Sequence, residues 1–128
     1  MTISDNKNEE PTTAIVIDDD HDAVDVFCEY LELMNIHVLG KGYNGKDAVD
    51  MYHKFRPDVV FLDVTMPDYD GIYALEKIKQ INPRASIIII TADKTEEREN
   101  RLVELGASEI IYKPIEFGSM KLVSGHNL

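Results

Sequence analysis

Three aspartates in a row follow a short apolar segment near the start of the chain. Ala14–Ile17 is apolar throughout, and Asp18, Asp19 and Asp20 come directly after it. Three later apolar segments also end in side chains that can do chemistry, namely Asp63, Thr91 and Lys113. Carboxylates suit a hard divalent cation, and a carboxylate beside a cation, an amine and a hydroxyl is equipped for phosphoryl transfer.

These reactive side chains depend on an alternating series of strands and helices. Five short apolar segments read as buried strands, and four segments between them carry apolar residues at helical spacing. The predicted strands are 12–17, 37–43, 58–63, 86–91 and 109–113, and the predicted helices end near Asn35 or cover 44–55, 74–81 and 94–105. This order predicts an α/β fold with a doubly wound, five-stranded parallel sheet and right-handed crossovers. The glycine-containing strand 37–43 is expected at the edge.

The carboxyl ends of parallel strands form one rim, where sites of open α/β sheets lie. We therefore expect Asp18, Asp19 and Asp63 to converge there, and their mutual repulsion favours a bound cation such as Mg²⁺. Asp20 is instead expected to be the N-cap of the first helix. His21 is expected to be exposed rather than a ligand.

Composition excludes several other classes of function. The chain has 128 residues, enough for one domain, with a formal net charge of −11 and a pI near 4.6. Such acidity argues against binding to nucleic acid or to anionic membranes. The single cysteine, Cys28, permits no internal disulfide and is expected to be packed in the core. No secretory signal or transmembrane segment is evident, so a cytoplasmic location is expected.

Four motifs, in this order, resemble the receiver domain of two-component response regulators: IVIDDD, VVFLDVTMPDYDG, IIIITA and YKP. The similarity runs from about Thr12 to Ile115. It implies a flavodoxin-like (βα)₅ fold with strand order 2-1-3-4-5. It also implies a signalling switch rather than a turnover enzyme, phosphorylated by a histidine kinase or a phosphotransfer protein.

The resemblance assigns a role to each residue of the predicted metal site. Asp63 would be the phosphoacceptor and, with Asp19, would bind Mg²⁺ through carboxylate oxygens. The backbone carbonyl of Thr65 would be a further ligand. Asp18 would act through a metal-bound water.

The resemblance also names residues around the phosphoryl group. Lys113 would contact it, and the hydroxyl of Thr91 would move toward it as part of the switch. Ala92 would contact the phosphoryl group or tune its lifetime, and Thr65 and Asp93 would influence how readily water attacks the phosphoaspartate.

One departure from the family concerns the switch residue, which is often an aromatic three residues before the lysine. Here that position is Ile110, and Tyr112, adjacent to Lys113, is expected to face elsewhere on the strand. Signalling would then rely on Thr91 and on the helix 94–105, which has few apolar residues to anchor it.

The ends of the chain form a second departure. Residues 1–11 are expected to be a disordered lead, 12–117 the receiver domain, and 118–128 an atypical tail. Its glycines and serines predict a short or missing fifth helix, as a natural variant or as a truncation followed by foreign residues. An incompletely covered sheet would favour a homodimer or an exchange of elements.

Two rival functions stay open at this point. A Mg²⁺-dependent phosphohydrolase would use the same aspartyl-phosphate chemistry, but the chain offers little room for a substrate pocket. A pseudo-receiver used only for binding is disfavoured by the complete set of acidic, hydroxyl and amine side chains. No residue pattern identifies a downstream target.

Overall fold

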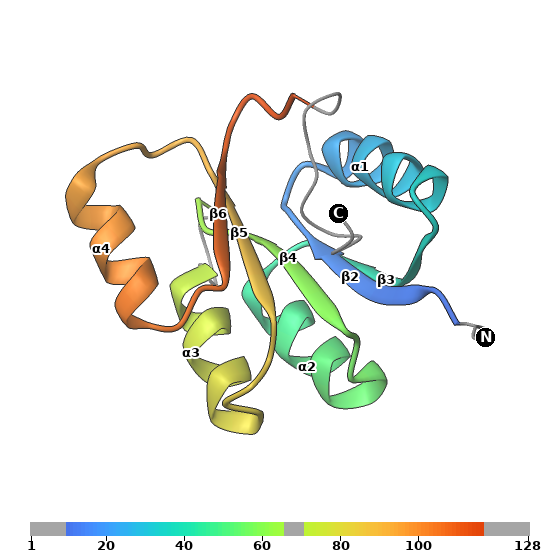
Figure 1. Ribbon diagram of the computed structural model, residues 1–128, viewed down its shortest axis with the longest axis horizontal. Helices are drawn as coiled ribbons and strands as arrows, with labels where there is room; N and C mark the ends of the chain where they lie inside the picture. The colour runs from blue at the N-terminus through green and yellow to red at the C-terminus, as the bar shows by residue number, and fades with distance from the viewer. Residues whose placement is uncertain (1–9, 66–70, 117–128) are drawn as a thin grey trace, which may run out of the picture.

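Five strands alternate with four helices along the part of the chain that this computed structural model describes, residues 10–65 and 71–116 (Figure 1). The strands are β2 (Thr12–Ile17), β3 (Ile36–Gly42), β4 (Val59–Asp63), β5 (Ile87–Thr91) and β6 (Glu109–Tyr112). The helices are α1 (His21–Leu33), α2 (Gly45–Phe55), α3 (Gly71–Ile81) and α4 (Glu96–Glu104). The predicted order of elements is confirmed, with small shifts at their ends.

All neighbouring strands pair in parallel, in the order β3-β2-β4-β5-β6. Numbered along the chain, this is the predicted order 2-1-3-4-5. The strand β3 lies at the edge, as its glycines predicted, and its pairing with β2 shifts register between Ala14 and Ile15. The connection from β2 leads outward to β3, and the chain then returns to β4 on the other side of β2. The point where strand order reverses therefore lies between the carboxyl ends of β2 and β4, which is where such sheets bind their ligands.

Helices cover the two faces of the sheet unequally. Helices α2, α3 and α4 pack on one face, with the buried residues Ala48, Tyr52, Ala74, Leu75, Ile78 and Leu102. Among the described helices, α1 alone packs on the other face, through Val24, Phe27, Cys28 and Leu31. Cys28 is buried there, as predicted. None of the described helices has the length and apolar composition that crossing a bilayer requires.

The central strands form a rigid base for the rim. Every residue of β4 and of β5 is buried, because each strand has a neighbour on both sides and helices on the sheet faces. The backbone at the carboxyl ends of these strands is therefore held in a defined position by close packing.

Asp20 lies at the start of α1 and is its N-cap, as predicted. Its Oδ1 accepts hydrogen bonds from the backbone N–H groups of Asp22, at 3.1 Å, and Ala23, at 3.2 Å. These donors have no partner within the first turn of the helix, so the aspartate side chain satisfies them.

Helix α4 is weakly anchored. Leu102 is its one buried side chain, whereas α1 has four, and Val103 of α4 is 59% exposed. The expectation that this helix is held by few apolar contacts is confirmed.

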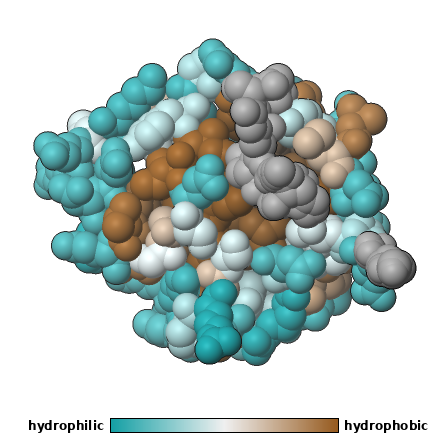
Figure 2. Space-filling model, viewed as in Figure 1, coloured by the Kyte–Doolittle hydropathy of each residue, from teal (hydrophilic) through white to brown (hydrophobic). Residues whose placement is uncertain are grey.

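The face of the sheet that α1 covers carries hydrophobic surface over β5 and β6 (Figure 2). Ile111 and Ile115 are partly buried against the core on this face. The predicted tail and fifth helix lie outside the described residues, as does the predicted lead except for residues 10 and 11. Dimerisation through this face stays a prediction.

Candidate functional site

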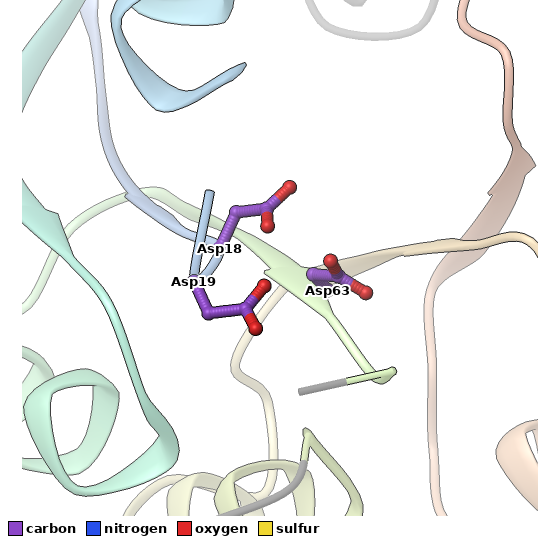
Figure 3. A group of neighbouring side chains, drawn as sticks. All are labelled: Asp18, Asp19 and Asp63. Carbon is purple, nitrogen blue, oxygen red and sulfur yellow. The ribbon is translucent and has the colours of Figure 1, made fainter. Parts of the chain in front are cut away.

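The carboxyl ends of β2 and β4 bring three aspartates together (Figure 3). Asp18 and Asp19 follow β2, Asp63 ends β4, and one carboxylate oxygen of each lies within 4.8 Å of the others. Figure 3 shows the side chains of Asp18 and Asp19 pointing toward Asp63. The predicted convergence of these residues on one rim is therefore present in the structure.

Burial distinguishes the three carboxylates. Asp63 is 1% exposed and Asp18 is 8% exposed, whereas Asp19 is an exposed residue. Two buried carboxylates at contact range are unfavourable unless positive charge or hydrogen-bond donors compensate them.

Hydrogen bonds hold both oxygens of Asp63. Oδ1 accepts from the backbone N–H of Thr65 at 2.8 Å and from its hydroxyl at 2.6 Å. Oδ2 accepts from Nζ of Lys113 at 3.0 Å, and the same amine lies 3.4 Å from Oδ2 of Asp18. Lys113 thus lies between the two buried carboxylates and neutralises part of their charge.

The sequence did not predict the hydrogen bond from the Thr65 hydroxyl to Asp63. It predicted only that the backbone carbonyl of Thr65 binds the metal ion and that Thr65 affects the lifetime of the phosphoaspartate. An aspartate side chain often accepts from the backbone N–H two residues later, and a threonine there can add its hydroxyl. That local pattern is the signal that could have revealed the contact.

The carboxyl groups of Asp18 and Asp63 have opposite pKa shifts. Burial, together with the charge of Asp63, raises the pKa of Asp18 to about 6, although the backbone N–H of Asp20 opposes this. Burial also raises the pKa of Asp63, but hydrogen bonds from Thr65 and Lys113 outweigh it, and the net shift is downward. Asp18 is therefore the first of the pair to take up a proton.

This shift predicts a pH-dependent effect of Asp18→Asn on the free energy of unfolding. Folded Asp18 holds its proton up to about pH 6, whereas in the unfolded chain it loses it near pH 4. As pH rises through this window, the folded wild type loses stability relative to the variant. In chelator, the substitution should therefore stabilise the protein by about 1–2 kcal/mol at pH 7.5 and by much less at pH 4.5. Urea unfolding at both pH values measures this, and an equal effect at both would contradict the assignment.

Thr91 lies at the carboxyl end of β5 and is fully buried. Its Oγ1 accepts a hydrogen bond from the backbone N–H of Asp93 at 3.0 Å, and its carbonyl accepts from the N–H of Lys113 at 2.9 Å. Ala92 is exposed and lines a hollow that Asp18 and Lys113 also line. The residues predicted around the phosphoryl group therefore surround the same rim.

The expectation that Tyr112 faces elsewhere on the strand is wrong. Ile110 packs on the face of the sheet that carries α4, and residues two apart on a strand point to the same face. The hydroxyl of Tyr112 accordingly donates to Oε1 of Glu99 on α4 at 2.8 Å. This bond to a carboxylate raises the pKa of the Tyr112 hydroxyl.

His21 is exposed, as predicted, and is the first residue of α1. Its ring stacks on that of Tyr43, with centroids 3.7 Å apart and planes at 7°. Within the described part of the chain, the group of side chains close enough to share a metal ion consists of Asp18, Asp19 and Asp63, without His21.

This donor set fits Mg²⁺. Hard carboxylate oxygens from two or three aspartates, with water completing the shell, are what this ion prefers. Two of the three carboxylates are buried, so a cation here would also relieve their repulsion.

Comparison with known proteins identifies the family. A family model described as the response regulator receiver domain matches residues 14–123. The chain belongs to this family. The fold and the four motifs of this receiver domain thus agree with the match over residues 14–123.

Two relatives of this receiver domain match it over about two thirds or more of their own length. It is 38% identical to protein CcdB of Bacillus subtilis over 105 residues, which are 82% of this chain and 88% of that protein. It is 37% identical to the chemotaxis protein CheY of Thermotoga maritima over 79 residues, 62% of this chain and 66% of that protein. Among solved structures, it resembles the CheX–CheY–BeF₃–Mg²⁺ complex of Borrelia burgdorferi with a TM-score of 0.81 and 27% identity, covering 84% of this chain and 82% of that one.

Proposed function

We propose that this receiver domain is a phosphoacceptor switch in which Asp63 takes a phosphoryl group from a histidine kinase or a histidine phosphotransfer protein. The observation that carries the proposal is the setting of Asp63. It is buried at the centre of the rim, with Thr65 on one oxygen, Lys113 on the other, and two further aspartates beside it.

The reaction is a displacement at phosphorus. An oxygen of the Asp63 carboxylate forms a bond to the phosphorus atom of a phosphohistidine, and the bond from phosphorus to the imidazole nitrogen breaks. The electron pair of that bond stays on the nitrogen, and the product is an acyl phosphate. Asp63 suits the role of nucleophile because its lowered pKa keeps it ionised at neutral pH.

Two residues stabilise the transferred group. The amine of Lys113, already 3.0 Å from Asp63, neutralises negative charge on the phosphoryl oxygens. The hydroxyl of Thr91 donates to one of these oxygens. Since Thr91 also accepts from the N–H of Asp93, its displacement pulls on the segment that leads into α4.

Mg²⁺ would be held by Asp19 and Asp63 directly, by the carbonyl of Thr65, and by Asp18 through water. When bound, the cation supplies positive charge that offsets the charge of the phosphoryl group. The clustered carboxylates support this ligand set, as does the similarity to a CheX–CheY complex that contains Mg²⁺. Thr65, Ala92 and Asp93 would then control the approach of water to the acyl phosphate.

A small-molecule acyl phosphate tests this function without knowledge of the natural donor. We expect acetyl phosphate with Mg²⁺ to add one phosphoryl group to each chain, in a form that hydroxylamine removes and that chelator prevents. A phosphoryl group that resists hydroxylamine would contradict an acyl phosphate. Repeated turnover of phosphoesters would instead support the phosphohydrolase.

Asp19→Asn should weaken Mg²⁺ binding by at least about tenfold, because it removes one of the two carboxylates proposed to bind the ion directly. Binding to the folded state raises the unfolding temperature, so the Mg²⁺ dependence of thermal unfolding measures the affinity. Asp20→Asn is the matched control, since it removes the same charge one residue away and asparagine is also a good N-cap. Equal affinities in the wild type and Asp19→Asn would contradict the ligand assignment.

A further inference from the structure

Tyr112 connects the site to α4. It is the strand partner of Thr91 in the pairing of β5 with β6, and it immediately precedes Lys113. The backbone N–H of Lys113 donates to the carbonyl of Thr91 at 2.9 Å, so strand pairing and this bond join the three residues into one unit. From this unit the hydroxyl of Tyr112 reaches Glu99 of α4 at 2.8 Å.

A second line of contacts joins Thr91 to the start of the same helix. The backbone N–H of Asp93 donates to Oγ1 of Thr91, and the Asp93 carboxylate accepts from the N–H of Thr95 at 3.0 Å. Thr95 is the N-cap of α4, and Asp93 also lies 3.6 Å from Nε of Arg98. Both lines therefore end within the first turns of α4.

These polar contacts matter because α4 has little else to fix its position. Leu102 is its one buried side chain. Beyond the contacts of Glu99 and Arg98, Arg101 lies 3.4 Å from Glu76 of α3, in an exposed pair. Exposed pairs contribute little to stability, so each contact is easily exchanged for water. A helix held in this way can change position when one of its contacts changes.

We propose that Tyr112 is a positioning residue of the phosphorylation site, acting through Lys113 and Thr91 and coupled by its hydroxyl to Glu99 of α4. The inference rests on the proposed function of Asp63. Residue 110 is an isoleucine and cannot form such a bond, whereas Tyr112 lies on the same face and forms it. Coupling between two sites is reciprocal, so a change in α4 alters the phosphorylation site as phosphorylation alters α4.

Tyr112→Phe tests the coupling by removing only the hydroxyl. Release of this bond frees the end of β6, which lets Lys113 and Thr91 adjust around the incoming phosphoryl group. We expect acetyl phosphate to phosphorylate Tyr112→Phe about two- to fivefold faster than the wild type, the size expected for one exposed hydrogen bond. Glu99→Ala should have the same effect. Amide hydrogen exchange of α4, measured without phosphodonor, should be faster in both variants.

Two further substitutions serve as controls on α4. Glu99→Gln keeps a carbonyl oxygen that accepts from Tyr112, so it should restore the wild-type rate. Glu97→Ala removes an equal charge two residues away and should leave the rate unchanged. The double variant Tyr112→Phe, Glu99→Ala should be no faster than either single variant, because both remove one bond.

The results that overturn the inference are distinct from those that overturn the proposed function. Wild-type phosphorylation rates in Tyr112→Phe, or an equal acceleration by Glu97→Ala, would overturn the inference alone. A wild type that accepts no phosphoryl group would overturn the proposed function. In that case the amide resonances of Thr91 and Lys113, measured without phosphodonor, still decide the coupling. Shifts in Glu99→Ala that Glu97→Ala does not cause would support it, and their absence would overturn it.

Discussion

Replacing Asp63 with asparagine is expected to reduce phosphoryl incorporation from acetyl phosphate to background. The amide oxygen is a poor nucleophile, so the bond to phosphorus does not form. Asparagine can still accept from Thr65 through its oxygen, and it nearly matches aspartate in volume. The fold should therefore persist, and the loss of incorporation can be assigned to chemistry.

Asp20→Asn is the matched control for this experiment. It makes the same chemical change in the run of three aspartates that follows β2, but at the residue that caps α1. Incorporation should stay at the wild-type level in this variant. Stoichiometric incorporation into Asp63→Asn, or its loss from Asp20→Asn, would contradict the assignment of Asp63 as the acceptor.

Lys113→Met is expected to slow phosphorylation by about 100-fold, the effect of removing one charged donor from a preorganised site. Methionine keeps an unbranched apolar stem and removes the amine that lies 3.0 Å from Asp63 and 3.4 Å from Asp18. The two buried carboxylates then face each other without that cation, which should also raise the pKa of Asp18 further. The rate of acyl phosphate formation measures the first effect, and far-ultraviolet circular dichroism checks that the variant is folded.

Lys41→Met provides the corresponding control. Lys41 pairs with Asp25 at 2.9 Å on the surface, so its removal changes the net charge equally without touching the rim. A wild-type rate in Lys113→Met would show that this amine does not stabilise the transferred group. An equally slow Lys41→Met would show that the effect is one of net charge.

Much of the fold could be predicted because each signal in the sequence had one dominant physical cause. Ile87–Thr91 is apolar on both faces, which is typical of a parallel strand with helices on both sides of the sheet. All five of its residues are buried in the structure. The glycines of β3 placed it correctly at the edge. The carboxyl ends of parallel strands lie on one rim, so the sequence also predicted that Asp18, Asp19 and Asp63 converge. They do so because β2 and β4 are neighbours in the sheet.

The contacts around the rim were harder to predict because they depend on side-chain direction and on elements distant in sequence. The bond from Tyr112 to Glu99 joins β6 to α4, and no local pattern marks Glu99 among the acidic residues of that helix. The face of Tyr112, by contrast, follows from the period of two along a strand, which places it with Ile110. The double contact of Thr65 with Asp63 requires the turn that follows β4.

The opposite pKa shifts of Asp18 and Asp63 also had no signal in the sequence. Both are aspartates at strand ends, and both are buried. They differ because Asp63 receives hydrogen bonds from Thr65 and a short contact with Lys113, whereas Asp18 has a longer contact with the same amine. The structure therefore keeps Asp63, the proposed nucleophile, ionised, whereas burial raises the pKa of its neighbour Asp18.

Chemical mapping of the phosphorylated residue tests the central claim most directly. Borohydride reduces an acyl phosphate to an alcohol, so a phosphorylated aspartate becomes homoserine and can be located by peptide mass spectrometry. After treatment with acetyl phosphate and Mg²⁺, we predict homoserine at position 63 and at no other aspartate. Homoserine at Asp18 or Asp19, or none in a protein that carries the phosphoryl group, would contradict the assignment of Asp63 as the phosphoacceptor.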